Sequence, residues 1–324
     1  KQKPPSVKPA KQTTTLESRD DPIVVVGMAC RVPGCKTTAE FDSLLFTGRS
    51  AIGEMPHSRF DRELYFDKKK GRPGKTYATL GGCAPAYSAE DNALPISQEL
   101  RDQYDTAHLQ FCDVATAAWR SAGLRVGNAK WQNTGVYVGH SGGTEFGGKL
   151  GLATQIEEAL DFLRDVPSFC DLPADQQQRI IRNVAAELRQ SRPFRTPGQG
   201  PHYNAYLAAS LAANALQFTG ARHVVDGACA SSLVALNHAT MAMKAGRIDA
   251  AIVGGATYNG VDNLILFSHS QACSDNGSRP FDNDASGLIS AEGYVAVVIT
   301  TMSRALQHRL PIEAVITGLG VSTD

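Results

Sequence analysis

The stretch that decides the fold is VVDGACASSLVAL, residues Val224–Leu236. Its two β-branched residues indicate a strand, Asp-Gly-Ala indicates a tight turn, and the residues after the turn have helical spacing. The sequence thus places Cys229 at the first turn of a helix, between small residues. We expect this helix start to be buried, where unpaired backbone N–H groups and the helix dipole favour thiolate, the nucleophilic form of cysteine. Cys229 is therefore the candidate covalent nucleophile.

Length and composition exclude several classes of protein. The 324 residues hold one large domain or two small ones, and 42% of them are hydrophobic, as in soluble globular proteins. Lys+Arg and Asp+Glu are both 32, so charge gives no argument for binding nucleic acid or an anionic membrane. No apolar run approaches the roughly 20 residues that span a bilayer, and the Lys- and Pro-rich start has no signal core. We expect a cytoplasmic protein without a membrane span.

The cysteines indicate neither a metal site nor a redox motif. There are seven, and no two are spaced as Cys-x-x-Cys. The first predicted strand is not followed by Gly-x-Gly-x-x-Gly, so no dinucleotide site is expected either. We therefore predict no metal and no cofactor bound by this chain. The cysteines other than Cys229 are expected to be reduced and mostly buried: Cys30, Cys35, Cys83, Cys112, Cys170 and Cys273.

Short apolar runs that alternate with helical stretches predict an α/β fold. Strands are predicted over 23–27, 136–139, 224–225, 250–255, 294–300 and 313–318. Helices are predicted over 38–48, 98–122, 150–192 (in two stretches), 203–216, 231–244 and 303–307, with loops over 28–34 and 53–95. Strands of this kind form a mixed, mostly parallel sheet that helices cover on both faces. The last strand is either an edge strand or the start of a further part of the fold. Residues 1–20 are too polar to order themselves and are predicted to be a disordered linker.

A second candidate nucleophile comes after the strand at 136–139. Gly139-His140-Ser141-Gly142-Gly143 matches the Gly-x-Ser-x-Gly elbow of serine hydrolases and acyltransferases. An elbow leads directly into a helix, and the glycine-rich residues after Ser141 are poor helix formers. A hydrolase or acyltransferase that uses Ser141 is therefore the alternative to Cys229.

Four further segments stand in order around the cysteine stretch. They are IVVVGMACRVPG at 23–34, GKTY and GG within 74–82, SRPFD at 278–282 and AEG at 291–293. Together with DGACASSL at 226–233 they resemble motifs of the beta-ketoacyl synthase (ketosynthase) domain, a member of the thiolase superfamily, as found in polyketide and polyunsaturated-fatty-acid-type synthases. The resemblance covers residues 21–324. It implies a thiolase-like layered α/β fold, with the N-terminal half and the first strand of the second half present.

The resemblance also implies a reaction and partners. Cys229 would take an acyl group from the phosphopantetheine of an acyl carrier protein, and its backbone N–H would form half of an oxyanion hole. Decarboxylative condensation with a malonyl-type thioester would come next. The phosphopantetheine belongs to the carrier protein, so the domain itself needs no cofactor. A homodimer is implied, with Val224 and Val225 near its two-fold axis, as are neighbouring acyltransferase or other synthase domains.

Missing histidine motifs limit these expectations. The family's two histidines lie in His-Gly-Thr-Gly-Thr and Asn-x-Gly-His contexts, and neither occurs here. We therefore expect this chain alone to condense nothing, and His140, His223 and His238 to be structural. A non-catalytic half that dimerises or docks a carrier protein is a third hypothesis. Residues 147–201 are longer than in modular synthases and resemble those of iterative synthases that make polyunsaturated fatty acids, glycolipid chains or enediyne cores.

Overall fold

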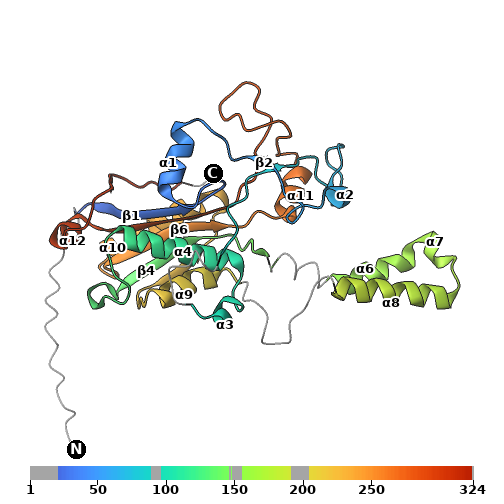
Figure 1. The fold of residues 1–324 in the computed structure, drawn as a ribbon, viewed down its shortest axis with the longest axis horizontal. Coiled ribbons are helices and arrows are strands. Elements are labelled where there is room, and N and C mark those ends of the chain that lie inside the picture. Colours follow the sequence, from blue (N-terminus) through green and yellow to red (C-terminus); the bar gives the residue numbers. More distant parts are fainter. Residues whose placement is uncertain (1–20, 89–95, 146, 148–154, 191–203, 323–324) are drawn as a thin grey trace, which may run out of the picture.

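The computed structural model describes residues 21–88, 96–145, 147, 155–190 and 204–322, so the linker predicted over 1–20 lies outside the described residues (Figure 1). The strands are β1 (Ile23–Arg31), β2 (Gly53–Glu54), β3 (Leu80–Gly81), β4 (Thr134–Gly139), β5 (Arg222–Val225), β6 (Ala250–Thr257), β7 (Gly293–Thr301) and β8 (Ala314–Ile316). The helices are α1 (Thr38–Phe46), α2 (Arg62–Tyr65), α3 (Gln98–Arg101), α4 (Thr106–Ser121), α6 (Ile156–Phe162), α7 (Pro167–Cys170), α8 (Ala174–Gln190), α9 (Tyr206–Ala215), α10 (Ser231–Lys244), α11 (Val261–His269) and α12 (Met302–Gln307). Short 3-10 turns are η2 (Ala129–Trp131), η3 (Leu163–Asp165) and η4 (Ala228–Ala230).

A six-stranded sheet in the order β5-β4-β6-β7-β1-β8 forms the centre of the molecule. β5, β4 and β6 are parallel neighbours, whereas β7 pairs antiparallel with both β6 and β1, and β8 pairs antiparallel with β1. Four of the six strands thus run in one direction, and the predicted α/β fold with a mixed sheet is confirmed. β5 and β8 are the two edges, so the last predicted strand is an edge strand in this structure.

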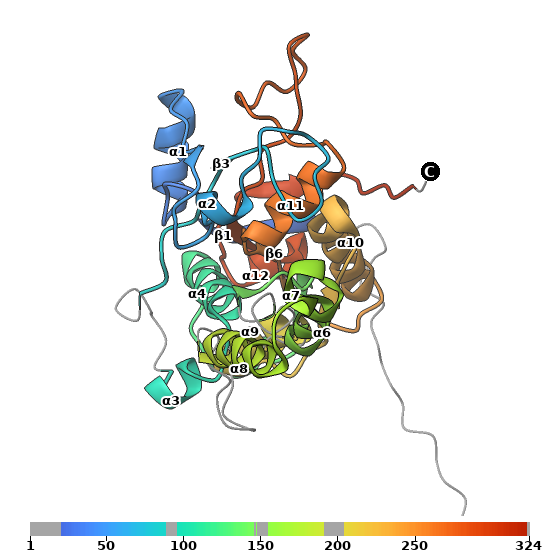
Figure 2. The ribbon, with the colours of Figure 1, turned by 90° about the vertical axis from the view of Figure 1, so that its right-hand side faces the viewer.

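Helices cover both faces of the sheet. Figure 2 shows α4 and α10 on opposite sides of β6. Successive residues of a strand point to opposite faces, and in β4 Val136 and Val138 pack in the core with α4 and α9 while Tyr137 packs in the core with α10. Apolar residues therefore occur at consecutive positions of the central strands, which is the signal that predicted them.

The long segment between β4 and α9 contains a helical hairpin. Within the described residues 155–190, α6 and α8 pack through a small cluster in which Ile156, Leu160 and Ala185 are buried. In Figure 1 this hairpin projects from the layered body. The two predicted helical stretches between 150 and 192 are confirmed for the residues that the structure describes.

Most predicted boundaries lie within two residues of the observed ones, and two predicted elements show the largest differences. β1 does not end at Gly27 but continues to Arg31, because a register shift between Val25 and Gly27 lets it stay paired with β7. The helix predicted over 98–122 is broken into α3 and α4. The break comes from Asp105, whose side chain accepts a hydrogen bond from the Ala107 N–H and caps α4 as a new helix.

The region predicted as surface loops over 53–95 is partly buried. Met55 and Phe60 pack in a cluster with Leu264 of α11, a helix for which no prediction was made. The polar, glycine-rich sequence hid this contact, because the two apolar residues lie too far apart for any periodicity. Among the described helices, none has the length and apolar character needed to cross a membrane.

Candidate active site

The carboxyl ends of three strands lie together at one end of the sheet. β5, β4 and β6 are parallel neighbours, so their carboxyl ends lie together, at the kind of edge where open α/β sheets bind ligands. The turn with Cys229 comes after β5, His140 and Ser141 come after β4, and Tyr258 comes after β6. The sequence placed Cys229, His140 and Ser141 after strands, and the structure brings them to the same end of the sheet, together with Tyr258, which was not predicted.

The turn before Cys229 has a constrained backbone. Ala228 has a φ of 49°, in the left-handed region that costs a non-glycine residue about 1 kcal/mol. Side-chain hydrogen bonds hold it there. Asp226 Oδ1 accepts from the Ala228 N–H at 3.0 Å, and Ser231 Oγ donates to the Ala228 carbonyl at 2.6 Å while accepting from the Gly227 N–H at 2.9 Å. The turn is therefore fixed on both sides of the cysteine.

Cys229 itself is exposed. It lies in η4, and α10 begins two residues later, so the predicted order of strand, turn, cysteine and helix is confirmed. The predicted burial of this helix start is wrong for the chain by itself, because β5 is an edge strand and Asp226–Ala230 lie on open surface. Among the described residues, the Cys229 N–H has no hydrogen-bond acceptor.

The other cysteines differ from Cys229 in environment. All seven are free, and Cys30, Cys35, Cys112 and Cys273 are buried. Burial raises the pKa of the Cys112 thiol well above its ordinary value, and it also raises the pKa values of Cys30, Cys83 and Cys273. Cys170 is also exposed, but it lies on α7, away from the strand ends. The described residues contain no cluster of three or more His, Cys, Asp or Glu side chains suited to a metal ion.

Ser141 does not have the geometry of a nucleophile elbow. It is exposed after β4, but Gly142 takes a φ of 85° and residues 142–144 are not helical. The first glycine of the motif has a different role. A Cβ at Gly139 would lie 2.6 Å from the Ser231 carbonyl carbon and would also clash with the Ser232 nitrogen. Gly139 therefore lets β4 contact the start of the helix that begins after Cys229.

A buried charged network at the same edge was not predicted. Glu292 forms an ion pair with Arg59 (Nη2 to Oε2, 3.1 Å) and accepts a hydrogen bond from the Tyr294 hydroxyl at 2.9 Å. The Arg59 guanidinium lies 4.0 Å from the Tyr258 ring centroid. Burial raises the pKa of Glu292, and Arg59 opposes this shift. Glu292 stood in a motif of the sequence, but no signal pointed to Arg59 in its polar loop.

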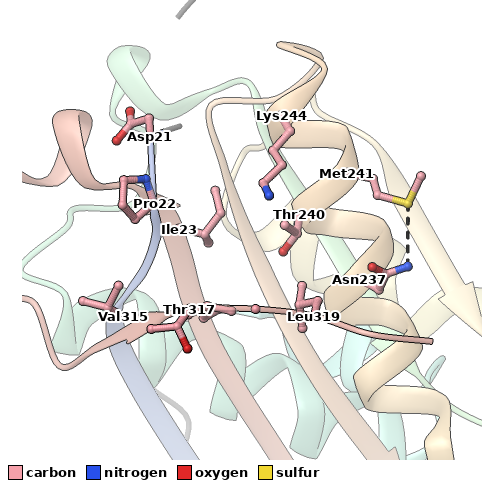
Figure 3. A pocket seen from close by; sticks show the side chains of 12 residues that line it. Asp21, Pro22, Ile23, Asn237, Thr240, Met241, Lys244, Val315, Thr317 and Leu319 are labelled. Carbon is pink, nitrogen blue, oxygen red and sulfur yellow. Dashed lines mark hydrogen bonds between the residues drawn. The ribbon is translucent and has the colours of Figure 1, made fainter. Parts of the chain in front are cut away.

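A groove of about 500 Å³ lies at the other end of α10 (Figure 3). Its lining includes Ile23, Thr240, Lys244, Val315 and Leu319, from the start of β1, the last turns of α10 and the region of β8. Cys229 precedes the first turn of α10, so this groove is separate from the strand ends that carry it.

Comparison with known proteins identifies the family. The family described as "Beta-ketoacyl synthase, N-terminal domain" matches residues 20–305. The chain belongs to the beta-ketoacyl synthase family.

Relatives of this ketosynthase-family chain occur in large synthases. It is 28% identical over 97% of its length to the PKS-NRPS hybrid synthetase ATPKS of Aspergillus niger, of which it covers 15%. It is 26% identical over 96% of its length to polyketide synthase ThaG of Burkholderia thailandensis, of which it covers 5%. It is 26% identical over 94% of its length to the pikromycin polyketide synthase component PikAII of Streptomyces venezuelae, of which it covers 7%.

Solved structures show the same fold. The oxazolomycin ketosynthase domain OzmH KS7 of Streptomyces albus JA3453 matches with a TM-score of 0.68 and 25% identity, over 92% of this chain and 45% of that one. The ketosynthase from module 6 of the bacillaene synthase of Bacillus subtilis matches with a TM-score of 0.67 and 23% identity, over 92% of this chain and 43% of that one. The predicted thiolase-like ketosynthase fold is confirmed, and the chain spans less than half of each of these two domains.

Proposed function

We propose that Cys229 is the acyl acceptor of a ketosynthase. Its thiolate would attack the carbonyl carbon of an acyl thioester, form a new thioester, and release the donor's pantetheine thiol. The observation that carries this proposal is the position of Cys229, an exposed thiol on a hydrogen-bonded turn at the ends of three parallel strands. Membership of the beta-ketoacyl synthase family supports it.

The backbone N–H of Cys229 would stabilise the oxyanion of this step. It has no acceptor among the described residues, and a fixed N–H aimed at developing negative charge lowers the barrier of acyl transfer. The constrained Ala228 backbone supports this role, because it fixes the direction of the next peptide group.

The reaction also requires partners. We propose that an acyl carrier protein with phosphopantetheine delivers the acyl group, that a malonyl-type thioester extends it by decarboxylative condensation, and that residues 21–324 are the N-terminal portion of the ketosynthase domain. Neighbouring acyltransferase or other synthase domains would belong to the same assembly. A homodimer across the β5 edge is part of the proposal, because apolar side chains of α10 beside that strand are open, with Leu233 67% and Met241 61% exposed.

Condensation would need more than this chain supplies. None of its eight histidines lies in the His-Gly-Thr-Gly-Thr or Asn-x-Gly-His context of the family. We propose that these 324 residues load an acyl group but form no carbon–carbon bond alone. Carbon–carbon bond formation by these residues alone would contradict this.

Acyl loading tests the proposal. The full-length protein is incubated with an acyl thioester, and the modified peptide is located by mass spectrometry. We expect the acyl group on Cys229, no loading in Cys229→Ala, and unchanged loading in Ser141→Ala, the matched control at the next strand end. Loading that survives Cys229→Ala and disappears in Ser141→Ala would instead favour the serine enzyme, and a folded protein that loads neither residue would favour the non-catalytic half.

A further inference from the structure

His140, the residue directly after β4, is buried although its neighbour Ser141 is exposed. Its side chain and backbone are 2% exposed in total. The backbone N–H of His140 donates to the Val225 carbonyl at 3.1 Å, and the ring Nδ1 of His140 lies 2.9 Å from the Ala256 carbonyl oxygen. A carbonyl oxygen only accepts hydrogen bonds, so Nδ1 carries the proton. One residue thus joins the ends of β5, β4 and β6.

The ring bond begins where the strand pairing ends. The last β4–β6 pair is Gly139 with Gly255, and the His140 ring donates a hydrogen bond to Ala256, the next residue of β6. The His108 ring of α4 packs against it edge to face, with the ring centroids 5.7 Å apart. Nε2 of His140 has no hydrogen-bond partner among the described residues. The ring is therefore oriented by its single bond to Ala256 and by packing.

We infer that His140 is a positioning residue for Cys229. This inference rests on the proposed role of Cys229 as acyl acceptor and deepens it. The Cys229 turn has two anchors, and both rest on the end of β4: Val225 accepts the His140 N–H, and the start of α10 packs on Gly139. The bond from the His140 ring to Ala256 holds the end of β4 against β6. Without it the β4–β6 pairing ends at Gly139–Gly255, and both anchors lose a restraint one residue beyond the ladder. Displacements of about 1 Å slow enzymatic reactions by up to about 100-fold.

Two substitutions separate the bond from the bulk of the ring. His140→Leu fills similar space without a donor, whereas the amide nitrogen of His140→Asn can occupy the place of Nδ1. The measurement is the rate of acyl transfer to Cys229 in the full-length protein, with melting temperatures of each variant. We expect His140→Leu to lose at least about tenfold in rate and His140→Asn to recover most of it.

Thr134→Val is the matched control at the opposite end of β4. Thr134 is fully buried and its hydroxyl donates to the Trp131 carbonyl at 2.6 Å, so valine removes the same kind of bond far from the turn. We expect it to lower the melting temperature and to leave the rate of acyl transfer unchanged. An unchanged rate in His140→Leu, or an equal loss in Thr134→Val, would overturn the inference.

Two further comparisons cover the remaining cases. If His140→Leu does not fold, His140→Asn is compared with His140→Gln, whose amide lies one bond farther out. Slower transfer in the Gln variant supports the inference, and equal rates overturn it. If Cys229→Ala still accepts the acyl group, the proposed function itself fails, whatever the His140 variants do.

Discussion

The Cys229 turn and the Ser141 loop are neighbours at the same edge of the sheet, and in sequence both look like a nucleophile after a strand. Their structures differ in the residues beyond the strand end. After β5, side-chain hydrogen bonds fix the turn and α10 begins two residues beyond Cys229. After β4, residues 142–144 are not helical, and Gly142 has a left-handed backbone. The two stretches share a sequence signal, and the structure fixes the following residues only at Cys229.

Two glycines explain why the Gly-x-Ser-x-Gly motif is present around Ser141 although the chain does not form a nucleophile elbow there. Gly139 is required by the close contact of β4 with the start of α10, which is the helix of the other site. Gly143 has open space, since a Cβ there would meet only the Tyr258 carbonyl oxygen at 3.8 Å. In an elbow both glycines would be needed for close packing, so the two positions offer a direct test.

The largest effect is expected from Gly139→Ala. Its methyl group would push against the Ser231–Ser232 backbone, which cannot yield without moving α10, and we expect a loss of about 3 kcal/mol in the free energy of unfolding. Gly143→Ala is the control and should change it by less than about 0.5 kcal/mol. Urea unfolding of both variants measures this, and equal losses would favour the elbow.

A smaller effect is expected from Ser231→Ala. This change removes the hydroxyl that bonds both Ala228 and Gly227, and we expect about 2 kcal/mol of destabilisation and slower acyl transfer to Cys229. Ser141→Ala removes an exposed hydroxyl and should cost less than about 0.5 kcal/mol. Thermal melting and acyl-transfer rates check both variants. A Ser231→Ala variant with unchanged stability and rate would show that the turn does not depend on this side chain.

The smallest expected effect is on how the free energy of unfolding depends on pH. Burial lowers the pKa of His140, and its hydrogen bond to Ala256 and the charge of Asp226 oppose this only in part. In the unfolded chain His140 binds a proton below about pH 6.5, whereas in the folded chain it does so only at lower pH. The free energy of unfolding therefore falls as the pH falls below about 6.5.

The matched variants isolate this contribution. His140→Asn should weaken the decline in stability between about pH 7.5 and about pH 5.5, the range in which an ordinary histidine titrates, measured by urea unfolding. His238→Asn removes an exposed histidine of α10 and is the control. An equal fall in the free energy of unfolding in wild type and His140→Asn would show that buried His140 does not cause this pH dependence.

The sequence predicted the elements that depend on local signals. The buried strands stood out as apolar runs, and Cys229 stood out because strand, turn and helix signals met there. The break between α3 and α4 was missed, because helical spacing continues past Asp105 and only its hydrogen bond to Ala107 shows the cap. His140 was expected to be structural, but its partner Ala256 was not predicted, and neither was Arg59. Ala256 and Glu292, the partner of Arg59, lie more than 100 residues away in the chain.

Protection from alkylation tests the central claim most directly. Cys229 and Cys170 are both exposed thiols, and only Cys229 lies at the strand ends. The full-length protein is incubated with an acyl thioester, treated with iodoacetamide, and digested for mass spectrometry. We predict that prior acylation protects Cys229 from alkylation and leaves Cys170 equally reactive. Equal alkylation of Cys229 with and without the thioester, with an acyl group found on Ser141, would contradict the account.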